Sequence, residues 1–186
     1  MTDLAGALAA IDAANAADPS REEDRPAALI YGERMTAELN RLFPGAPDML
    51  QIAARGQHVE RWLLPRNDYP DGKEGYLAWR REQGRRHGAR VAGIMAGAGY
   101  GPPDCARVAV LLRKEGIKRD AEVQALEDVI CFVFLRWYFQ PFAERRSAEE
   151  VLDIVTKTAR KMSSEGRARV LAEFDLPEPL AVAFRD

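Results

Sequence analysis

The hydrophobic positions of the chain recur with a helical period almost everywhere, and strict alternation over five or more residues is hard to find. This pattern predicts an all-α protein. We expect Thr2 to cap the first helix, and Ser147 with Glu150 three residues later to form a capping box. The expected helices cover about 3–17, 26–42, 76–98, 102–114 and 120–139, with others that begin near 47, at 147, and at 163 or 164.

The segment 120–139 reads DAEVQALEDVICFVFLRWYF and is the most apolar of these helices. Beyond Asp128 it is apolar on nearly all sides, which is typical of a helix in the centre of a bundle. We therefore expect a buried central helix, ended by Pro141, with Glu127 and Asp128 where the helix enters the core.

One of the two histidines lies in the stretch AARGQHVERWLLPR, residues 53–66. If the helix that begins near 47 continues through it, Gln57 and Arg61 lie one turn apart, as do His58 and Trp62. A loop rich in Pro and Gly follows directly. Two interpretations are open: a hydrogen-bonded structural corner, or the wall of a site for a charged small molecule.

The second histidine, His87, lies in the basic run GRRHGARVAG. Arg86 and Arg90 are one helical turn apart and could together bind a phosphate group, and Lys114 lies in another basic stretch before the central helix. The alternative is a solvated charged face.

Length and charge limit the function classes. The 186 residues show no linker or break in composition, which favours a single domain over 1–186. The net charge of -2, from abundant charges of both signs, gives no signal for nucleic acid or a membrane, so a charged partner must be bound locally.

With no secretory signal and no membrane-spanning run, we expect a cytoplasmic protein. The apolar tail LAVAFRD packs either within the chain or across a homo-oligomer.

Metal binding needs at least three protein donors in most sites, and the sequence has neither HExxH nor a dense run of His, Cys and Asp. Because there are only two histidines, a metal site here requires carboxylates. A histidine can also transfer protons near neutral pH.

The motifs AARGQHVERW, RRHGARVAGIMAGAGY and LLRKEGIKRDAEVQALEDVICFVFL, in this order, resemble the domain-of-unknown-function family 4202. The resemblance covers nearly the whole chain, from IDAANAADP through YGERM to KTARKMS. That family brings no established activity. More distantly, the order is similar to the HD (His-Asp) superfamily of helical metal-dependent phosphohydrolases, which implies an HD-like helical bundle.

In the HD comparison His58 matches the histidine of the His-Asp pair, Asp128 the distant aspartate, and His87 an additional histidine. The resemblance thus implies a divalent metal ion held by these three residues. The sequence departs from it at Val59, which replaces the paired aspartate, and at LIYGERM, which has no histidine where the first ligand is expected.

Two hypotheses follow, and the sequence does not decide whether the protein is an enzyme. The first is a metal-dependent phosphohydrolase acting on a small phosphate-bearing or nucleotide-like ligand. The second is a non-catalytic ligand-binding or protein-interaction domain that keeps the fold without metal chemistry. In either case we expect His58, His87 and Asp128 to converge. The candidate catalytic residues are His58, His87, Glu127 and Asp128, and the candidate ligand-binding residues are Gln57, Arg61, Trp62, Arg86, Arg90 and Lys114.

Overall fold

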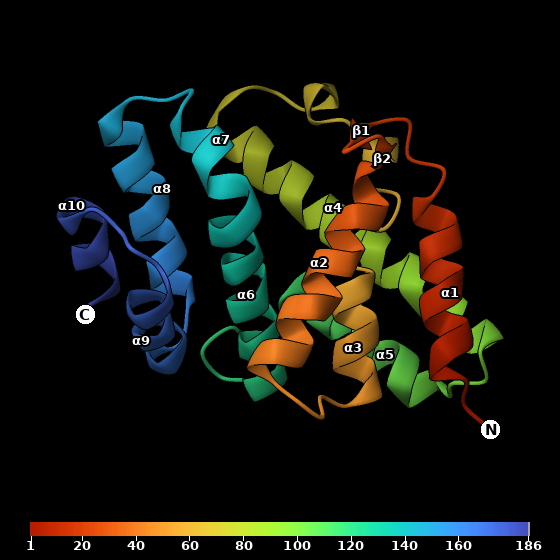
Figure 1. Cartoon of the computed structure of the whole chain (residues 1–186). Helices are drawn as coiled ribbons and strands as arrows, with labels where there is room; N and C mark the ends of the chain where they lie inside the picture. The colour runs from red at the N-terminus through yellow and green to blue at the C-terminus, as the bar shows by residue number, and fades with distance from the viewer. Residues whose placement is uncertain (186) are drawn as a thin grey trace. The chain divides into compact units, whose positions relative to one another are not determined.

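The protein is all-α, as the hydrophobic period predicts (Figure 1). The structure is a computed structural model that describes residues 1–185. The chain forms two compact units, unit 1 (Met1–Glu115) and unit 2 (Gly116–Asp186). The expectation of a single domain stays a prediction. No helix within the described residues is long and apolar enough to cross a membrane.

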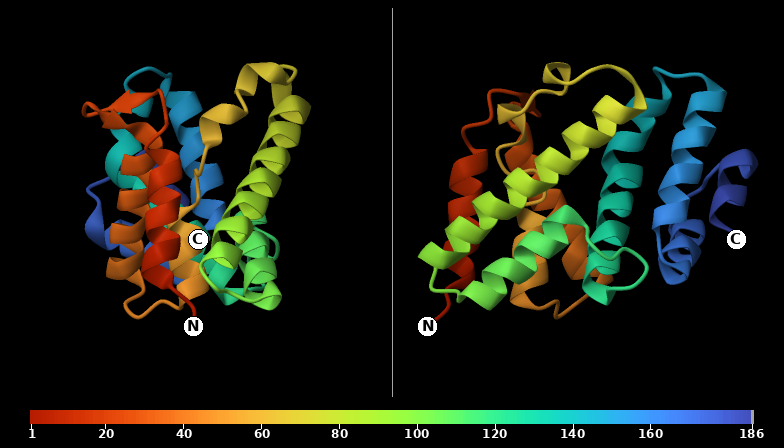
Figure 2. Two further views of the ribbon diagram at one scale, coloured as in Figure 1. Left: turned by 90° about the vertical axis from the view of Figure 1, so that its right-hand side faces the viewer. Right: turned by 180° about the vertical axis from the view of Figure 1, so that it is seen from behind.

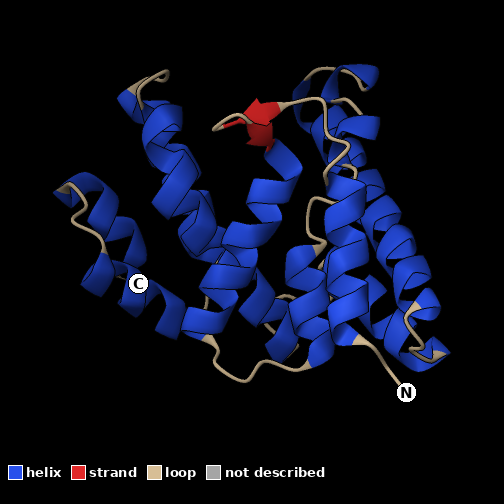
Figure 3. Ribbon diagram, turned by 45° about the vertical axis from the view of Figure 1, so that its right-hand side comes forward, coloured by secondary structure: helices blue, strands red, loops and turns tan. Residues whose placement is uncertain are grey.

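Unit 1 contains five α-helices and one short antiparallel strand pair, which Figure 3 shows in red. In the strand pair, Arg21 lies opposite Pro26 and Glu22 opposite Arg25. The elements are α1 (Leu4–Asn15), β1 (Arg21–Glu22), β2 (Arg25–Pro26), α2 (Ala27–Leu42), α3 (Asp48–Arg55), α4 (Gly72–Gly97) and α5 (Pro102–Arg113).

Two helix starts in unit 1 differ from the prediction. The cap of α1 is Asp3 rather than Thr2, because the Asp3 carboxylate accepts a hydrogen bond of 2.8 Å from the backbone N–H of Gly6. Helix α4 begins four residues before the expected Tyr76, at Gly72.

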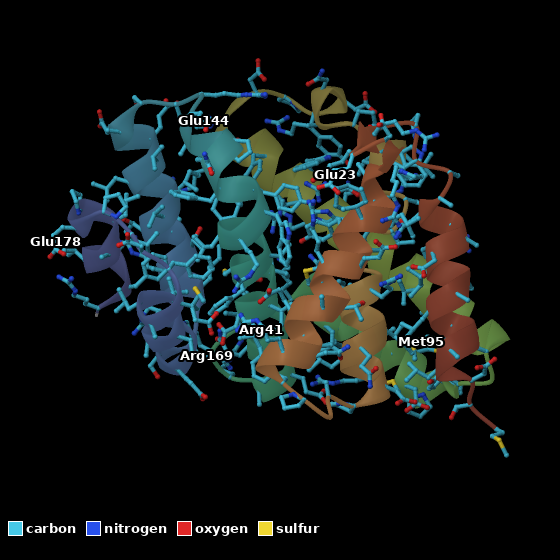
Figure 4. All side chains as sticks on the ribbon, viewed as in Figure 1. Glu23, Arg41, Met95, Glu144, Arg169 and Glu178 are labelled. Atoms are coloured by element: carbon cyan, nitrogen blue, oxygen red, sulfur yellow. The ribbon has the colours of Figure 1, made fainter. Side chains whose placement is uncertain are left out.

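The core of unit 1 is built from one face of each of its helices. Figure 4 draws the side chains on the ribbon and labels one of these core residues, Met95 of α4. The fully enclosed members are Ala7, Ile11, Met35, Leu39, Ile52, Ala53, Ala54, Val91, Met95, Val108 and Leu111, all at 0 % exposure.

Helices α4 and α5 form a hairpin, closed by a turn at Gly99 (Figure 2). Gly84 and Gly88 allow their close approach. A Cβ atom at Gly88 would lie 3.2 Å from Cα of Ala109, and one at Gly84 would lie 3.2 Å from the carbonyl oxygen of Leu112. The two glycines around His87 in GRRHG therefore set the helix packing.

Unit 2 begins with the predicted buried helix, α6 (Ala121–Val133), which Asp120 caps by accepting from the backbone N–H groups of Glu122 and Val123. The helical path continues through a π-helical turn (Phe134–Tyr138) into α7 (Phe139–Ala143). Pro141 does not end the helix as expected. It lies in the first turn of α7, and the wider π turn before it accommodates a residue without an N–H group.

The rest of unit 2 comprises α8 (Ala148–Lys161), α9 (Ser164–Glu173), α10 (Glu178–Ala181) and a 3-10 turn (Val182–Phe184). The capping box of Ser147 and Glu150 is confirmed, as is the start of α9 after Ser163. The apolar tail is helical and enters the core, since Phe184 is 2 % exposed.

Candidate functional site

The stretch 53–66 is not one helix. Helix α3 ends at Arg55, and Gly56 follows in a turn. A Cβ atom there would lie 2.6 Å from Cγ2 of Val91, so the close approach of α4 requires glycine. The prediction that Gln57 and Arg61 lie one helical turn apart is therefore wrong.

The same correction applies to His58 and Trp62. Glu60 lies between them in the left-handed conformation, with φ of 50°, and starts a short 3-10 turn, Arg61–Leu63. A residue other than glycine is strained in this conformation. Asn15 and Arg90 hold it there: Asn15 Oδ1 accepts from the Glu60 backbone N–H at 3.2 Å, and the Arg90 guanidinium donates to the Glu60 carboxylate at 3.0 Å.

Side chains of α4 bind the backbone carbonyl groups of residues 61–64. Gln83, buried at 3 % exposure, donates to the carbonyl oxygens of Arg61 and Leu64 at 3.0 and 3.1 Å. Trp79 Nε1 also donates to Leu64, at 3.0 Å, and Arg86 donates to the carbonyl of Leu63 at 3.2 Å. The loop that carries His58 and Arg61 is thus fixed to the helix that carries His87.

The structure brings the two histidines together within unit 1. The ring centroids of His58 and His87 lie 6.4 Å apart, with the ring planes tilted by 47°. Tyr31 of α2 stacks on His58, with 3.7 Å between centroids and 11° between planes. Three separate elements, α2, the loop and α4, therefore contribute one ring each.

Two buried polar atoms near these rings have no hydrogen-bond partner among the described residues. They are Nε2 of His87, a residue 4 % exposed, and Oε1 of Gln57, a residue 6 % exposed. Buried polar atoms are normally paired, so each unpaired one requires an explanation, such as a bound ion or a functional role.

Burial and nearby positive charges keep both imidazoles neutral. Burial is the largest cause that lowers the pKa of His87 to about 3, followed by the charges of Arg61, Lys114, Arg80 and Arg86. The pKa of His58 lies well below its ordinary value for the same first reason and through Arg61, His87, Lys114 and Arg80. A neutral imidazole offers one N–H donor and one acceptor nitrogen.

Two of these cations, Arg61 and Arg80, lie on aromatic rings. The guanidinium carbon of Arg61 is 4.6 Å from the centroid of Trp79, and that of Arg80 is 5.9 Å from the centroid of Tyr76. Burial lowers the pKa of Arg61, and the charge of Arg80 lowers it further. These two like charges therefore lie close enough to repel each other.

Within residues 1–185, neither Arg61 nor Arg80 forms an ion pair with a carboxylate. Other arginines of unit 1 do: Arg55 pairs with Asp12 at 2.6 Å, and the predicted ligand-binding residue Arg90 pairs with Glu60. The charges of Arg61 and Arg80, beside the histidines, are thus not compensated by a carboxylate in an ion pair.

Three further predicted ligand-binding residues lie in the same unit. Lys114 follows α5 in the left-handed conformation, with φ of 58°, and its charge lowers the pKa of both His58 and His87. Arg86 is exposed, and Trp62 is half-buried.

Glu127 and Asp128 belong to unit 2. Asp128 Oδ1 accepts from the backbone N–H of Ser163 at 2.8 Å and from Gln124 Nε2 at 3.1 Å, and Oδ2 accepts from the Ser163 hydroxyl at 2.5 Å. Glu127 lies 3.9 Å from the ammonium group of Lys161. Asp128 thus ties α6 to the start of α9. The expected convergence of these carboxylates with the histidines stays a prediction.

No group of three or more His, Cys, Asp or Glu side chains that could hold a metal ion occurs among the residues that the structure describes. The histidine site itself offers two neutral imidazoles, and the charges of Arg61, Arg80 and Lys114 around them oppose the binding of a metal cation.

Sequence reasoning did not place Tyr31, Gln83 or Arg80 among the site residues. A signal for Gln83 exists in the sequence, since Trp79, Gln83 and His87 recur every four residues and so line one face of α4. A signal for Tyr31 also exists, because the HD comparison places LIYGERM, which contains Tyr31, where the first ligand is expected.

The sequence model of one known family matches residues 5–183, nearly the whole chain; its description is "Domain of unknown function (DUF4202)". No curated protein and no solved structure matches the chain.

Proposed function

The chain belongs to the DUF4202 family, which brings no activity with it, and from the geometry of unit 1 we propose that this unit binds a small phosphate-bearing anion. The anion is held by Arg61 and Arg80, beside the imidazoles of His58 and His87. The proposal is one of binding, without a chemical step.

The observation that carries the proposal is the uncompensated pair Arg61 and Arg80. The charge of Arg80 lowers the pKa of Arg61, and no carboxylate within residues 1–185 neutralises either group. Two cations in this arrangement repel each other, and a dianion between them turns the repulsion into attraction. Guanidinium groups match the oxygen geometry of a phosphate and bind it through charge-assisted hydrogen bonds.

The histidines support the same ligand. As neutral groups, each can donate a hydrogen bond to a phosphate oxygen without the cost of burying another charge. Nε2 of His87 is buried and has no partner among the described residues, so it is available for such a bond.

The rigid attachment of the loop adds preorganisation. Gln83 and Trp79 hold the carbonyl groups on either side of the Arg61 turn. Trp79 also supports the Arg61 guanidinium from its face. A cation held in this way loses little conformational entropy on binding.

The test is calorimetric titration with methyl phosphate at pH 7.5 and low salt. We expect Arg61→Gln to weaken binding at least tenfold and Arg80→Gln several-fold, since hydrogen bonds to charged groups contribute about 1.5–3 kcal/mol each. The matched control is Arg81→Gln, which removes the same charge from the next, exposed residue of α4. We expect it to change the dissociation constant less than twofold.

The proposal is overturned if the unsubstituted protein does not bind methyl phosphate at millimolar concentration, or if Arg81→Gln weakens binding as much as Arg61→Gln. The same samples are assayed for release of inorganic phosphate. If the protein released inorganic phosphate from methyl phosphate and His58→Ala did not, the function would be phosphoester hydrolysis rather than binding alone.

A further inference from the structure

The exposed apolar side chains of unit 1 are concentrated at one segment. Apart from Met1, the large hydrophobic residues that the described part of unit 1 leaves exposed are Leu63, Tyr76 and Leu77, at 57 %, 44 % and 44 %. Single exposed apolar residues are normal, whereas apolar residues that adjoin one another on the surface are typical of a binding site.

The same segment carries the two uncompensated arginines. The ring of Tyr76 lies 5.9 Å from that of Trp79, at an angle of 42°. Arg80 lies over Tyr76 and donates a long hydrogen bond of 3.4 Å to its hydroxyl, while Arg61 lies over Trp79. Each of these two neighbouring rings therefore has one of the two guanidinium groups against it.

Trp79 is buried at 8 % exposure, whereas Tyr76 is not. The exposed ring is therefore Tyr76, and it lies directly beside the guanidinium of Arg80. On the loop side, Leu63 is held to α4 by the hydrogen bond from Arg86 to its carbonyl group. A cationic group thus adjoins exposed aromatic and aliphatic surface within unit 1.

We infer that the ligand of this site is a phosphate ester whose organic group is an aromatic ring, with its phosphate at Arg61 and Arg80 and its ring against Tyr76. The inference rests on the proposed function and names the ligand class. An inorganic phosphate ion uses only the arginines and leaves Tyr76 and Leu63 in water. An aryl ester covers this surface as well.

The arrangement favours an aromatic over an aliphatic group. Two rings attract each other in offset or edge-to-face geometry beyond the area that they bury. The ligand ring can also interact through its face with a guanidinium of the flanking arginines. A saturated ring of the same size buries similar area but gains neither contribution.

The test compares the dissociation constants of phenyl, cyclohexyl and methyl phosphate by calorimetry. We expect phenyl phosphate to bind about tenfold more tightly than methyl phosphate, with cyclohexyl phosphate in between. In Tyr76→Ser the ratio of methyl to phenyl dissociation constants should fall to near one, and Tyr76→Phe, which keeps the ring, should retain most of it.

The matched control is Leu152→Ser, which removes a large side chain of similar exposure, 40 %, from unit 2. We expect it to leave the ratio unchanged. Because Tyr76 is exposed, its substitution should not prevent folding, and urea unfolding verifies this.

The outcomes separate the two proposals. Equal binding of the three esters, or equal binding of the phenyl and cyclohexyl esters, overturns the inference and leaves phosphate binding in place. An unchanged ratio in Tyr76→Ser also overturns it. Absence of binding by all three esters overturns the inference together with the proposed function.

Discussion

The imidazole rings of His58 and His87 lie with their centroids 6.4 Å apart, although 29 positions separate them in the sequence (87 − 58). Each ring is neutral because burial and the same set of cations oppose its protonation. Protonation of one would also oppose protonation of the other. The pair should therefore link both the stability and the binding properties of unit 1 to pH.

Stability should fall as the pH drops below about 6.5. The pKa of His87 is about 3 in the folded protein and has its ordinary value of 6.5 in the unfolded chain. Between these values the unfolded state binds more protons than the folded state. The contribution of His87 to the free energy of unfolding is therefore complete above pH 6.5 and is lost as the pH falls toward 3. One such group changes the free energy of unfolding by up to about 1.4 kcal/mol per pH unit.

The measurement is urea unfolding at pH 7, 6 and 5, with His87→Gln as the comparison. Carboxylates with lowered pKa values, such as Glu33 and Glu82, contribute in the same direction in both proteins and cancel in the difference. We expect the stability advantage of the original protein to shrink as the pH falls. Parallel curves for the two proteins would contradict a neutral buried His87.

Anion binding should be coupled to proton uptake. A bound dianion offsets the cations that lower the pKa of His58 and His87, so both pKa values rise on binding. Sulfate is the appropriate probe, because it resembles phosphate and does not titrate above pH 3. We expect calorimetry at pH 5.5 in buffers of different ionisation enthalpy to show proton uptake by the protein. His87→Gln should reduce it, and an unchanged uptake in that variant would place the anion elsewhere.

The helical elements could be predicted from the sequence because they depend on local properties. The hydrophobic period, the capping box at Ser147 and the helix start at 163 or 164 are readable within one turn of the chain, and the structure confirms them. Pro141 was misread because its effect depends on the π turn before it, and a change of helix type leaves no periodic signal.

The geometry of the site depends on contacts between distant segments. The conformation of residues 56–63 follows from the approach of Val91 to Gly56 and from the bonds that Asn15 and Arg90 make to Glu60. None of these is local in sequence. His58 and His87 could be expected to lie close together, but the conformation of the loop and the positions of its Arg and Trp side chains could not be predicted.

Lys114 offers a test in which stability and binding change in opposite directions. It ends α5 with φ of 58°, a conformation that favours glycine, and its charge acts on both histidines. We expect Lys114→Gly to stabilise the protein by about 1 kcal/mol and to weaken methyl phosphate binding several-fold. Lys114→Gln removes the charge but keeps the strain, so it should weaken binding to a similar extent without the gain in stability.

Thermal unfolding of both variants gives the change in stability, and calorimetric titration gives the dissociation constant for methyl phosphate. If Lys114→Gly bound methyl phosphate as tightly as the original protein, the charge of Lys114 would have no part in the anion site.

Substitutions of Asp128 and His58 distinguish the anion-binding proposal from a metal-dependent hydrolase. In the anion-binding proposal, the cations around the histidines repel a divalent metal ion, and Asp128 serves as a structural acceptor for Ser163 and Gln124 within unit 2. We expect Asp128→Asn to lower stability by about 1–3 kcal/mol, because it replaces a charged acceptor of three hydrogen bonds, and to leave methyl phosphate binding unchanged.

The decisive measurement is elemental analysis of protein purified without a histidine tag or chelator, beside His58→Ala and Asp128→Ala. We expect less than a tenth of an equivalent of any transition metal, about the level of contamination, and methyl phosphate binding that persists in a chelator. Near-equimolar manganese, iron, zinc or nickel that is lost in both variants would mean that Asp128 and His58 share a metal. In that case phosphate would be bound through the ion, and phosphoester hydrolysis would become the function to pursue.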